Sequence, residues 1–515
     1  MRLKRLLYIA GLLLCCSCDN MLDVEPEIAV TYTNYFQNEQ DVHKTYIDMY
    51  AKLRDVYFQY QLQPHHKMGL VYDQCNEYYS YADELKNLSA EAFKKVDGTS
   101  WLLHYNVIFQ SNLILDNLYR VQDLPKDREN FYRGHCYFAK GLMYYEIARR
   151  WGNAPITRDS KSIDPLGRSD AKVVLDTALS NALRAFDLLK NYEEAVDYNG
   201  QKLKKYYAHK GAAAALLANI YAWKGGVFND PDAYKETEKY CTLIIENKVG
   251  IYKMVDTPEE VCSVVMDRLS SESVFELLNS SIDFGFTTGR FSPGINFHIG
   301  ENYGSGGYPL NPFGSVSNKY QNLYLIKNDR VKKIWSDGDL RRTAYFWKFD
   351  EMAAADEEIT GGFAYPYFWR KPLLDAAWDP AEMINVDGNK IFWRLAEIYL
   401  LRAEARCRAN LPGAEDDLNC VRNRAHAKAY PADTDTEGLQ MAIFRERERE
   451  MFFDGERYYD IVRNGYYTLP GMISEVFEQL TEQDVKDGAL YVPIMDTEMQ
   501  RNTLMRQNPY WLARW

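Results

Sequence analysis

Residues 391–427 of the chain read IFWRLAEIYLLRAEARCRANLPGAEDDLNCVRNRAHA, and this stretch decides the fold class. Helical periodicity runs through residues 391–409 and again through residues 414–427, where the apolar side chains fall on one stripe. The turn residues at 410–413 separate the two periodic segments. The pattern therefore predicts two helices joined by a short loop, a helical hairpin.

The same periodicity recurs upstream of this hairpin. The alanine run at residues 212–215 permits close contact between neighbouring helices, and Gly225 with Gly226 marks a break between two of them. No fixed-period sequence repeat is visible. Repeated helix pairs nevertheless predict a mainly α, solenoid-like layer, with upstream helices at residues 101–119, 131–150, 172–189, 204–224 and 234–246.

The length and composition exclude several classes of protein. A chain of 515 residues exceeds what one hydrophobic core usually organises, and 46% hydrophobic with 26% charged residues is typical of a soluble globular protein. A formal net charge of −12 argues against nucleic acid or an anionic membrane surface as the main partner. The 40 tyrosines exceed what a plain core needs, and tyrosine serves surfaces and wet pockets.

The first residues form a targeting segment. Positive charges precede an apolar run at residues 6–14, which is far shorter than the roughly 20 residues that span a bilayer. Ser17 before Cys18 resembles the lipobox of bacterial lipoproteins, so Cys18 is the expected lipidation site. Residues 1–17 are then the signal peptide and residues 18–30 a lipidated, polar tether that anchors without spanning. A secreted protein cut nearby without lipid is the alternative.

The remaining cysteines give no metal signature. They show no CxxC motif and no Cys/His spacing of a zinc site, so no metal and no cofactor are expected. Cys136, Cys241 and Cys407 fall within helical patterns, where a buried free thiol is the commoner outcome. Whether the six cysteines beyond the leader form disulfides stays open at this point.

Two segments differ from the helical pattern and are rich in aromatic residues. Residues 283–387 carry Gly, Pro, Asn and aromatics, including the motif YPYFW at 365–369. A shorter aromatic loop occupies residues 72–81. Long aromatic loops on a helical scaffold are where binding function is usually placed. In residues 445–450 the oppositely charged pairs Arg445/Glu448, Glu446/Arg449 and Arg447/Glu450 instead favour a helix surface over chemistry.

Several segments taken together resemble the SusD/RagB family of nutrient-capturing outer-membrane lipoproteins of Bacteroidetes. Trp101, Tyr105, Ile108 and Asn112 match in one helix. The order and spacing of the pieces make the resemblance specific, although Pro493-Ile494-Met495 departs locally from the family pattern. The other matching segments are CDNMLD at 18–23, RWGNAPI at 150–156, RLAEIYLLRAEA at 394–405, EREMFFDGERYYDIVR at 448–463 and QNPY at 507–510.

The resemblance implies a fold, a partner and a division of the chain. The implied fold has four tetratricopeptide-like helix pairs with an irregular, loop-rich ligand-binding lobe. The implied partner is a SusC-like TonB-dependent transporter, over whose barrel the lipoprotein sits on the cell surface. Residues 31–282 are then an N-terminal helical scaffold, 283–387 the ligand-binding region and 388–515 a C-terminal helical scaffold. The resemblance also implies that the charged motif residues form ion pairs and hydrogen bonds between helices and are not catalytic acids. These residues are Glu397, Arg402, Glu404, Arg449, Glu450, Glu456 and Arg457.

The expected function is non-catalytic binding of an oligosaccharide and its delivery to the transporter. Sugar rings present flat apolar faces flanked by hydroxyls, so a glycan site needs aromatic platforms beside polar side chains. The aromatic loops supply both. The candidate ligand-binding residues are Asp73, Asn76, Tyr78 and Tyr79 in the first loop, and Phe286, Arg290, Asn302, Tyr303 and Tyr308 in the second.

Other functions remain as alternatives. RagB-like binding of peptides for import is the runner-up. A glycoside hydrolase needs a pair of carboxylates, but nothing in the sequence singles out a pair. The sequence also lacks HExxH, a nucleophile elbow, a P-loop and a dinucleotide fingerprint, so an enzyme is not expected. A purely structural helical-repeat adaptor explains the scaffold but leaves the aromatic loops without a role.

Overall fold

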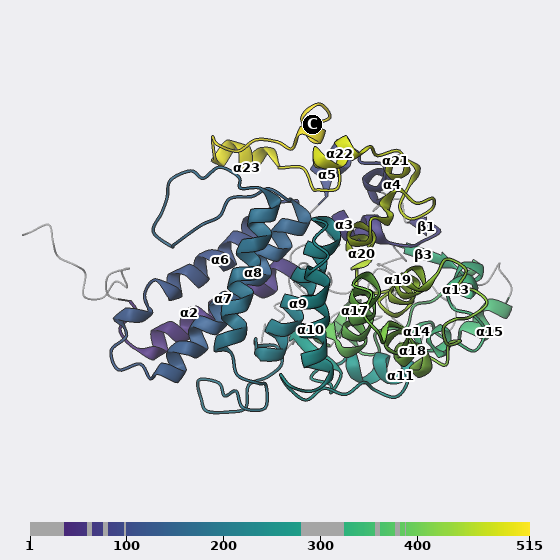
Figure 1. The fold of residues 1–515 in the computed structure, drawn as a ribbon, viewed down its shortest axis with the longest axis horizontal. Helices are drawn as coiled ribbons and strands as arrows, with labels where there is room; N and C mark the ends of the chain where they lie inside the picture. Colours follow the sequence, from purple (N-terminus) through teal and green to yellow (C-terminus); the bar gives the residue numbers. More distant parts are fainter. Residues whose placement is uncertain are drawn as a thin grey trace, which may run out of the picture.

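The computed structural model describes residues 35–58, 64–75, 81–96, 99–279, 324–355, 361–375, 382–386 and 388–515. Long helices pack against one another in chain order and form a curved layer (Figure 1). This confirms the predicted mainly α fold with its helix pairs. The layer consists of α2 (Glu39–Phe58), α6 (Leu102–Leu115), α7 (Lys126–Arg150), α8 (Ala171–Leu188), α9 (Lys210–Val227), α10 (Ala233–Ile245), α17 (Leu395–Arg408), α18 (Ala414–Arg424) and α19 (Leu439–Glu450).

Small residues bring the central helices of the layer close together. A Cβ on Gly141 of α7 would lie 3.1 Å from the backbone nitrogen of Ala182 on α8, so the two backbones nearly touch there. The alanine run at 212–215 in α9 is fully buried, as its sequence predicts. Close backbone approach removes more apolar surface from water for each residue, which stabilises the layer.

Several predicted helix boundaries are wrong. Helix α6 ends at Leu115 rather than at residue 119, α7 begins at Lys126 rather than at residue 131, and α9 continues through the predicted break at Gly225 and Gly226 to Val227. Two further differences have a local cause. Residues 391–394 belong to strand β7 (Lys390–Arg394), which pairs antiparallel with β2 (Ser273–Leu277), and α17 starts after it. The aromatic and branched residues of this segment suit a pleated surface as well as a helix. Helix α9 begins at Lys210, because the His209 side chain accepts a hydrogen bond from the Ala212 backbone and caps the helix.

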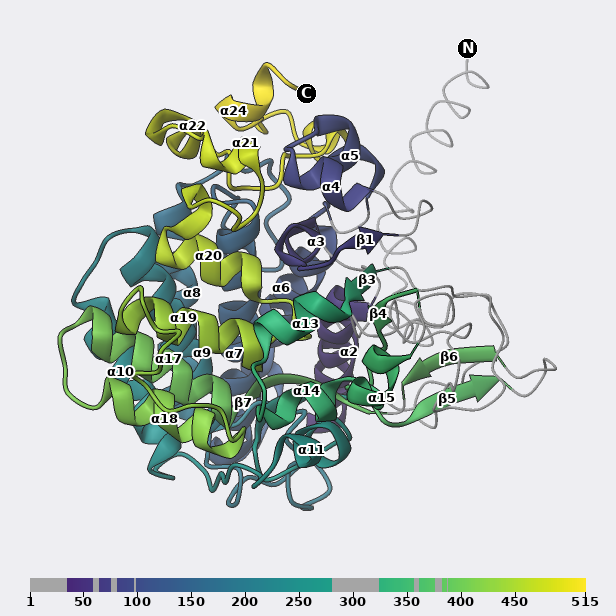
Figure 2. The ribbon, with the colours of Figure 1, turned by 90° about the vertical axis from the view of Figure 1, so that its right-hand side faces the viewer.

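Short helices and strands lie beside the helical layer (Figure 2), and buried side chains among them form a second hydrophobic cluster. Trp335, Tyr345 and Phe453 are among its buried members. Phe368 and Trp369 of the YPYFW motif are buried in it too, so these aromatic residues serve packing rather than exposed binding. The surrounding elements are β1 (Gln74–Cys75), β3 (Tyr324–Lys327), β4 (Phe363–Ala364), β5 (Pro372–Asp375), β6 (Glu382–Val386), α11 (Pro258–Glu260), η3 (Val261–Val265), α13 (Asn328–Ile334), α14 (Leu340–Tyr345) and α15 (Phe349–Ala354).

Short helices from both ends of the chain meet at one end of the molecule (Figures 1 and 2). The Phe93 ring packs edge-on against Trp511, and Lys94 donates to the Trp515 carbonyl at 3.2 Å. These contacts tie helix α5 to the last residues of the chain. The elements are α3 (Pro64–Gly69), α4 (Tyr81–Lys86), α5 (Ala90–Lys95), α20 (Arg457–Asn464), η5 (Tyr466–Thr468), α21 (Glu475–Glu478), α22 (Glu482–Lys486), α23 (Asp496–Arg501) and α24 (Pro509–Leu512). The short helix η2 (Leu118–Arg120) instead follows α6 in the helical layer.

Helix α19 is less of a surface helix than its charge pattern suggests. Arg445 pairs with Glu448 and Glu446 with Arg449, each at 2.6 Å, as predicted. Arg447 and Glu450 do not pair with each other. Arg447 binds Asp460 of α20 instead, Glu450 binds arginines of α14, β7 and α18, and both side chains are buried among these elements.

The motif charges on the helices do form ion pairs within the scaffold. Glu404 accepts two hydrogen bonds from Arg463, Arg402 donates two to Asp417, and Glu456 pairs with Arg149. These residues hold helices together, as the family resemblance implies. Removing one partner of a buried ion pair strongly lowers the stability of a protein, because the other charge is left buried without a partner.

Three further expectations can be compared with the described residues. Cys136 and Cys241 are free and buried, whereas Cys407 is free but only half-buried. No group of three or more metal-ligating side chains occurs in the described segments. Within those same segments, every helix falls short of the length and apolar character that crossing a membrane requires.

Candidate functional site

Of the predicted ligand-binding residues, Asp73 alone lies in the part of the chain that the structure describes. The lipidation site Cys18 lies outside it as well. The remaining candidates outside the described residues are Asn76, Tyr78, Tyr79, Phe286, Arg290, Asn302, Tyr303 and Tyr308. Their roles therefore stay predictions.

Asp73 is already engaged by its own fold. Its carboxylate accepts hydrogen bonds from the Lys327 backbone at 2.8 Å and from Arg330 Nε at 2.7 Å. Partial burial raises the pKa of Asp73, but these two hydrogen bonds outweigh it and the net pKa is lowered. The ionised carboxylate thus holds the start of α13 against β1 and orients Arg330.

One end of each segment that carries the other candidates adjoins the same pair of strands. Strands β1 and β3 pair antiparallel, with Cys75 opposite Tyr324. The chain enters residues 76–80 directly after Cys75 and returns from residues 280–323 directly before Tyr324. Two predicted binding segments far apart in sequence therefore share one point of attachment.

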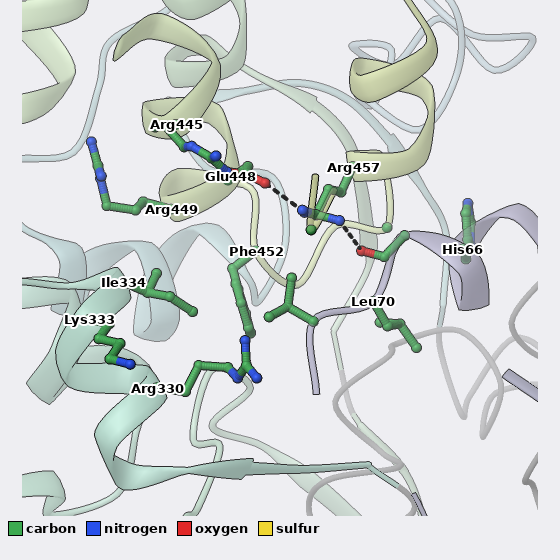
Figure 3. A pocket seen from close by; sticks show the side chains of 14 residues that line it. His66, Leu70, Arg330, Lys333, Ile334, Arg445, Glu448, Arg449, Phe452 and Arg457 are labelled. Atoms are coloured by element: carbon green, nitrogen blue, oxygen red, sulfur yellow. Dashed lines mark hydrogen bonds and ion pairs between the residues drawn. The ribbon is translucent and has the colours of Figure 1, made fainter. Parts of the chain in front are cut away.

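A cavity of about 330 Å³ lies next to this strand pair. Ligand pockets in proteins usually enclose roughly 300–1,000 Å³. Figure 3 shows side chains from α3, α13, α19 and the start of α20 around it. The lining residues are His66, Gly69, Leu70, Val71, Arg330, Lys333, Ile334, Arg445, Glu448, Arg449, Phe452, Gly455, Arg457 and Gly471.

Arg457 fixes the frame of this pocket. It donates to Glu448 Oε1 at 2.7 Å, to the Gly69 carbonyl at 3.3 Å and to the Met472 carbonyl at 2.9 Å. One guanidinium therefore joins α19, the end of α3 and the segment after η5. A Cβ on Gly69 would lie 2.8 Å from the Tyr458 backbone nitrogen, so α3 can approach α20 this closely only with glycine there.

One wall of the pocket is apolar and includes a half-buried ring. Phe452 is held by edge contacts with Trp335 at 4.9 Å and with Phe453 at 5.0 Å between ring centroids. Leu70 and Ile334 also line the cavity. Because Trp335 is buried behind it, the Phe452 ring has a fixed orientation, which is what an aromatic platform needs.

The other walls are strongly cationic. Burial lowers the pKa of His66 to about 3, so this imidazole is neutral at physiological pH. Glu448 is the single acidic side chain among the lining residues. Five cationic side chains line the same cavity: Arg330, Lys333, Arg445, Arg449 and Arg457.

A second hollow, at Asp116, Asp159, Lys161 and Ser162, is accounted for by its own loop. Asp116 accepts from the backbone and hydroxyl of Ser160, and Asp159 accepts from the backbones of Lys161 and Ser162. The carboxylates there close a turn rather than face a ligand.

Three carboxylates near the pocket or with a raised pKa show how acidic groups are held here. Burial raises the pKa of Glu397 to about 8, a value suited to a general acid, but the side chain is enclosed among helices next to Arg447. The carboxylates that line or adjoin the pocket are Glu448 and Asp73, and each accepts hydrogen bonds from arginine. The pocket is suited to binding.

Sequence reasoning missed the cavity. Arg445 and Glu448 looked like a solvated helix pair, and Phe452 looked like part of a family motif. Arg330 and Lys333 gave a weak signal as two of the three cations in α13, but nothing in the sequence places α13 beside α19.

Comparisons with known proteins agree with this fold. The sequence model of the SusD family matches residues 343–511, and a model described as starch-binding associating with outer membrane matches residues 20–222. A SusD-like protein of Formosa agariphila is 24% identical over 503 residues, covering 89% of each chain. The chain is thus a SusD-like family protein.

Solved structures give the same result for the fold. A SusD homolog from Bacteroides thetaiotaomicron superposes with a TM-score of 0.73 at 22% identity, covering 93% of this chain and 99% of that one. Surface glycan-binding protein A from the same organism superposes with a TM-score of 0.69 at 17% identity, covering 92% of this chain and 100% of that one.

Proposed function

We propose that this chain is a non-catalytic protein that binds oligosaccharide at the bacterial cell surface and delivers it for import. The supporting observation is the pocket with its aromatic ring and hydrogen-bond donors, near the strand pair that one end of each aromatic segment adjoins. Membership of the SusD-like family supports the same function, since one structural neighbour is a surface glycan-binding protein.

The site extends in this proposal from the pocket into the two predicted segments. Tyr303 and Tyr308 act as aromatic platforms, with Asn76 and Asn302 among the polar groups beside them. Rim aromatics exclude water only partly, so affinity is moderate and release is ready. That balance suits transfer to a transporter.

Lipidation at Cys18 anchors the protein to the outer membrane in this proposal. The description of the model matching residues 20–222 names outer-membrane association and supports this location. Cys18→Ala should leave an unprocessed or mislocalised precursor. Metabolic labelling with a fatty-acid analogue measures this, and label that persists in the variant would contradict the assignment.

A glycan array followed by calorimetry tests the binding function. The protein starting after residue 18 should bind one class of oligosaccharide and leave it chemically intact by chromatography. Shortening of the oligosaccharide in step with added protein, abolished by one Asp or Glu substitution, would show an enzyme. Binding of peptides but of no glycan would instead establish the peptide-import alternative.

The partner in this proposal is a SusC-like TonB-dependent transporter. A binder without catalytic groups contributes to import only if a channel stands beside it. The native protein should co-purify with such a transporter from outer membrane solubilised in mild detergent. Isolation as a lone monomer under gentle extraction would remove the partnership while leaving glycan binding intact.

A further inference from the structure

The cations around the pocket outnumber the carboxylates that touch them. Glu448 gives one oxygen to Arg445 and the other to Arg457. Arg330 is paired with Asp73. Arg449 is paired with Glu446, which also binds Arg341 and Arg422 inside the protein. Among the described residues, five lining cations thus face three carboxylates, a surplus of two positive charges.

This surplus stands out because the chain as a whole carries a net charge of −12. Within the described ranges Lys333 has no ion-pair partner, and Arg445 uses only its Nη1 atom on a carboxylate. A cleft lined by charge of one sign with low-dielectric walls concentrates ligands of the opposite sign.

The cationic groups lie around an apolar ring rather than on a flat surface. Figure 3 places Arg330, Lys333, Arg445 and Arg457 on different sides of Phe452. A ligand that fills this cavity therefore meets an aromatic face and guanidinium or ammonium donors at once. Guanidinium groups bind carboxylate and sulfate through paired hydrogen bonds, so anionic groups suit these donors.

We infer that the pocket selects an acidic oligosaccharide, one whose sugar rings carry carboxylate or sulfate groups. The inference rests on the proposed glycan-binding function and names the class of glycan. A sugar ring packs against Phe452, and its anionic substituent lies between Lys333 and Arg445. Neutral glycans lack an anionic group that could pair with the excess cationic side chains.

The test compares glycans that differ only in charge. Calorimetry on the protein starting after residue 18 uses oligogalacturonide against its fully methyl-esterified form, and sulfated galactan oligosaccharide against its desulfated form. At least one acidic probe should bind about tenfold or more tightly than its neutral partner. The two arms distinguish carboxylate from sulfate as the recognised group.

A matched pair of variants on α13 tests whether the pocket is responsible. Lys333→Glu should weaken binding of the acidic probe about fivefold to tenfold, because an attraction becomes a repulsion. Lys332→Glu makes the same change of charge one residue away, on a side chain that is absent from the pocket lining and lies 3.9 Å from Asp329. It should leave affinity unchanged.

The possible outcomes separate this inference from the proposed function. Equal affinity for acidic and neutral forms, unaffected by Lys333→Glu, would overturn acidic selection while glycan binding stands. Equal losses in Lys332→Glu and Lys333→Glu would show a general charge effect and overturn the pocket assignment. Binding of a glutamate-rich peptide with no glycan bound would overturn both, as would failure to bind every probe.

Discussion

Helix α19 presents one face to the protein interior and the other to the pocket, and the two faces treat charge differently. Inside, Glu450 binds Arg341, Arg394 and Arg424, and the cations are matched by carboxylates. At the pocket, Arg445 shares Glu448 with Arg457, so cations remain in excess. Ion pairs in the interior hold the helices together, whereas the excess cationic side chains at the pocket are available to bind a ligand.

The largest expected effect comes from the interior face. Glu450→Gln removes the one carboxylate that all three buried guanidiniums share, although each also pairs with another acid, and should lower the free energy of unfolding by about 3–5 kcal/mol. Urea denaturation followed by circular dichroism measures it.

Glu448→Gln is the matched control on the opposite face of α19. Its partners are closer to solvent, so the loss should stay below about 1 kcal/mol. Equal losses in the two variants would mean that the faces do not differ in the way described.

The interior pairs also predict acid sensitivity. Two hydrogen bonds from Arg463 accompany a fall in the pKa of Glu404: burial raises this pKa, but the arginine outweighs burial and brings it from 4.5 to about 2. A depressed pKa contributes stability that is present above about pH 4.5 and is lost as pH falls towards 2. The contribution is on the order of 3 kcal/mol, from the size of the shift.

Glu404→Gln should therefore flatten the decline of stability between pH 4.5 and 2.5, measured as the urea midpoint at each pH. Glu397, on the same helix, provides a contrast. Burial raises its pKa to about 8, so its contribution is present below pH 4.5 and is lost as pH rises towards 8. Glu397→Gln should alter that upper range only. An unchanged acid slope in Glu404→Gln would contradict the assignment.

We expect the same division between scaffold and site among the aromatic residues. Phe368 is buried against Phe453, and Phe368→Ala should cost about 3–5 kcal/mol of stability. Tyr303→Ala or Tyr308→Ala should instead weaken glycan binding by about 2 kcal/mol with stability nearly unchanged. Calorimetry and thermal unfolding of the variants separate the two. If the tyrosine variants bind normally but unfold more easily, those rings belong to a core.

The sequence predicts more of the fold than of the site. Helix periodicity located most helices of the layer, since residues 131–150 and 414–427 carry apolar stripes that dictate local structure, but it gave no range for α2. It failed at residues 391–394, where the pairing partner β2 lies more than a hundred residues upstream and overrides local preference.

The pocket could not be predicted in the same way. Arg330 and Arg445 look like ordinary surface charges, and only tertiary packing of α13 beside α19 turns them into a shared wall. The YPYFW motif shows the converse error. Its composition suits a binding loop, yet Phe368 and Trp369 fill a second core. Composition indicates what a side chain is able to do, whereas burial determines what it does.

The smallest expected effect tests the contrast between the two faces of α19 through salt. Exposed charges are screened over about 10 Å at 0.1 M ionic strength, whereas buried pairs are screened much less. Raising NaCl from about 20 to 200 mM should weaken binding of oligogalacturonide roughly threefold to tenfold. The free energy of unfolding contributed by Glu450 should change far less over that range.

Lys333→Gln sharpens this last comparison. The variant removes the lining cation that has no carboxylate partner in the described segments, so its affinity should respond less to salt than that of the unaltered protein. The methyl-esterified probe carries no charge and should show no salt response with either protein. If both proteins lose affinity for oligogalacturonide in parallel as salt rises, the attraction arises from the protein's surface as a whole, and the pocket's surplus charge does not select the ligand.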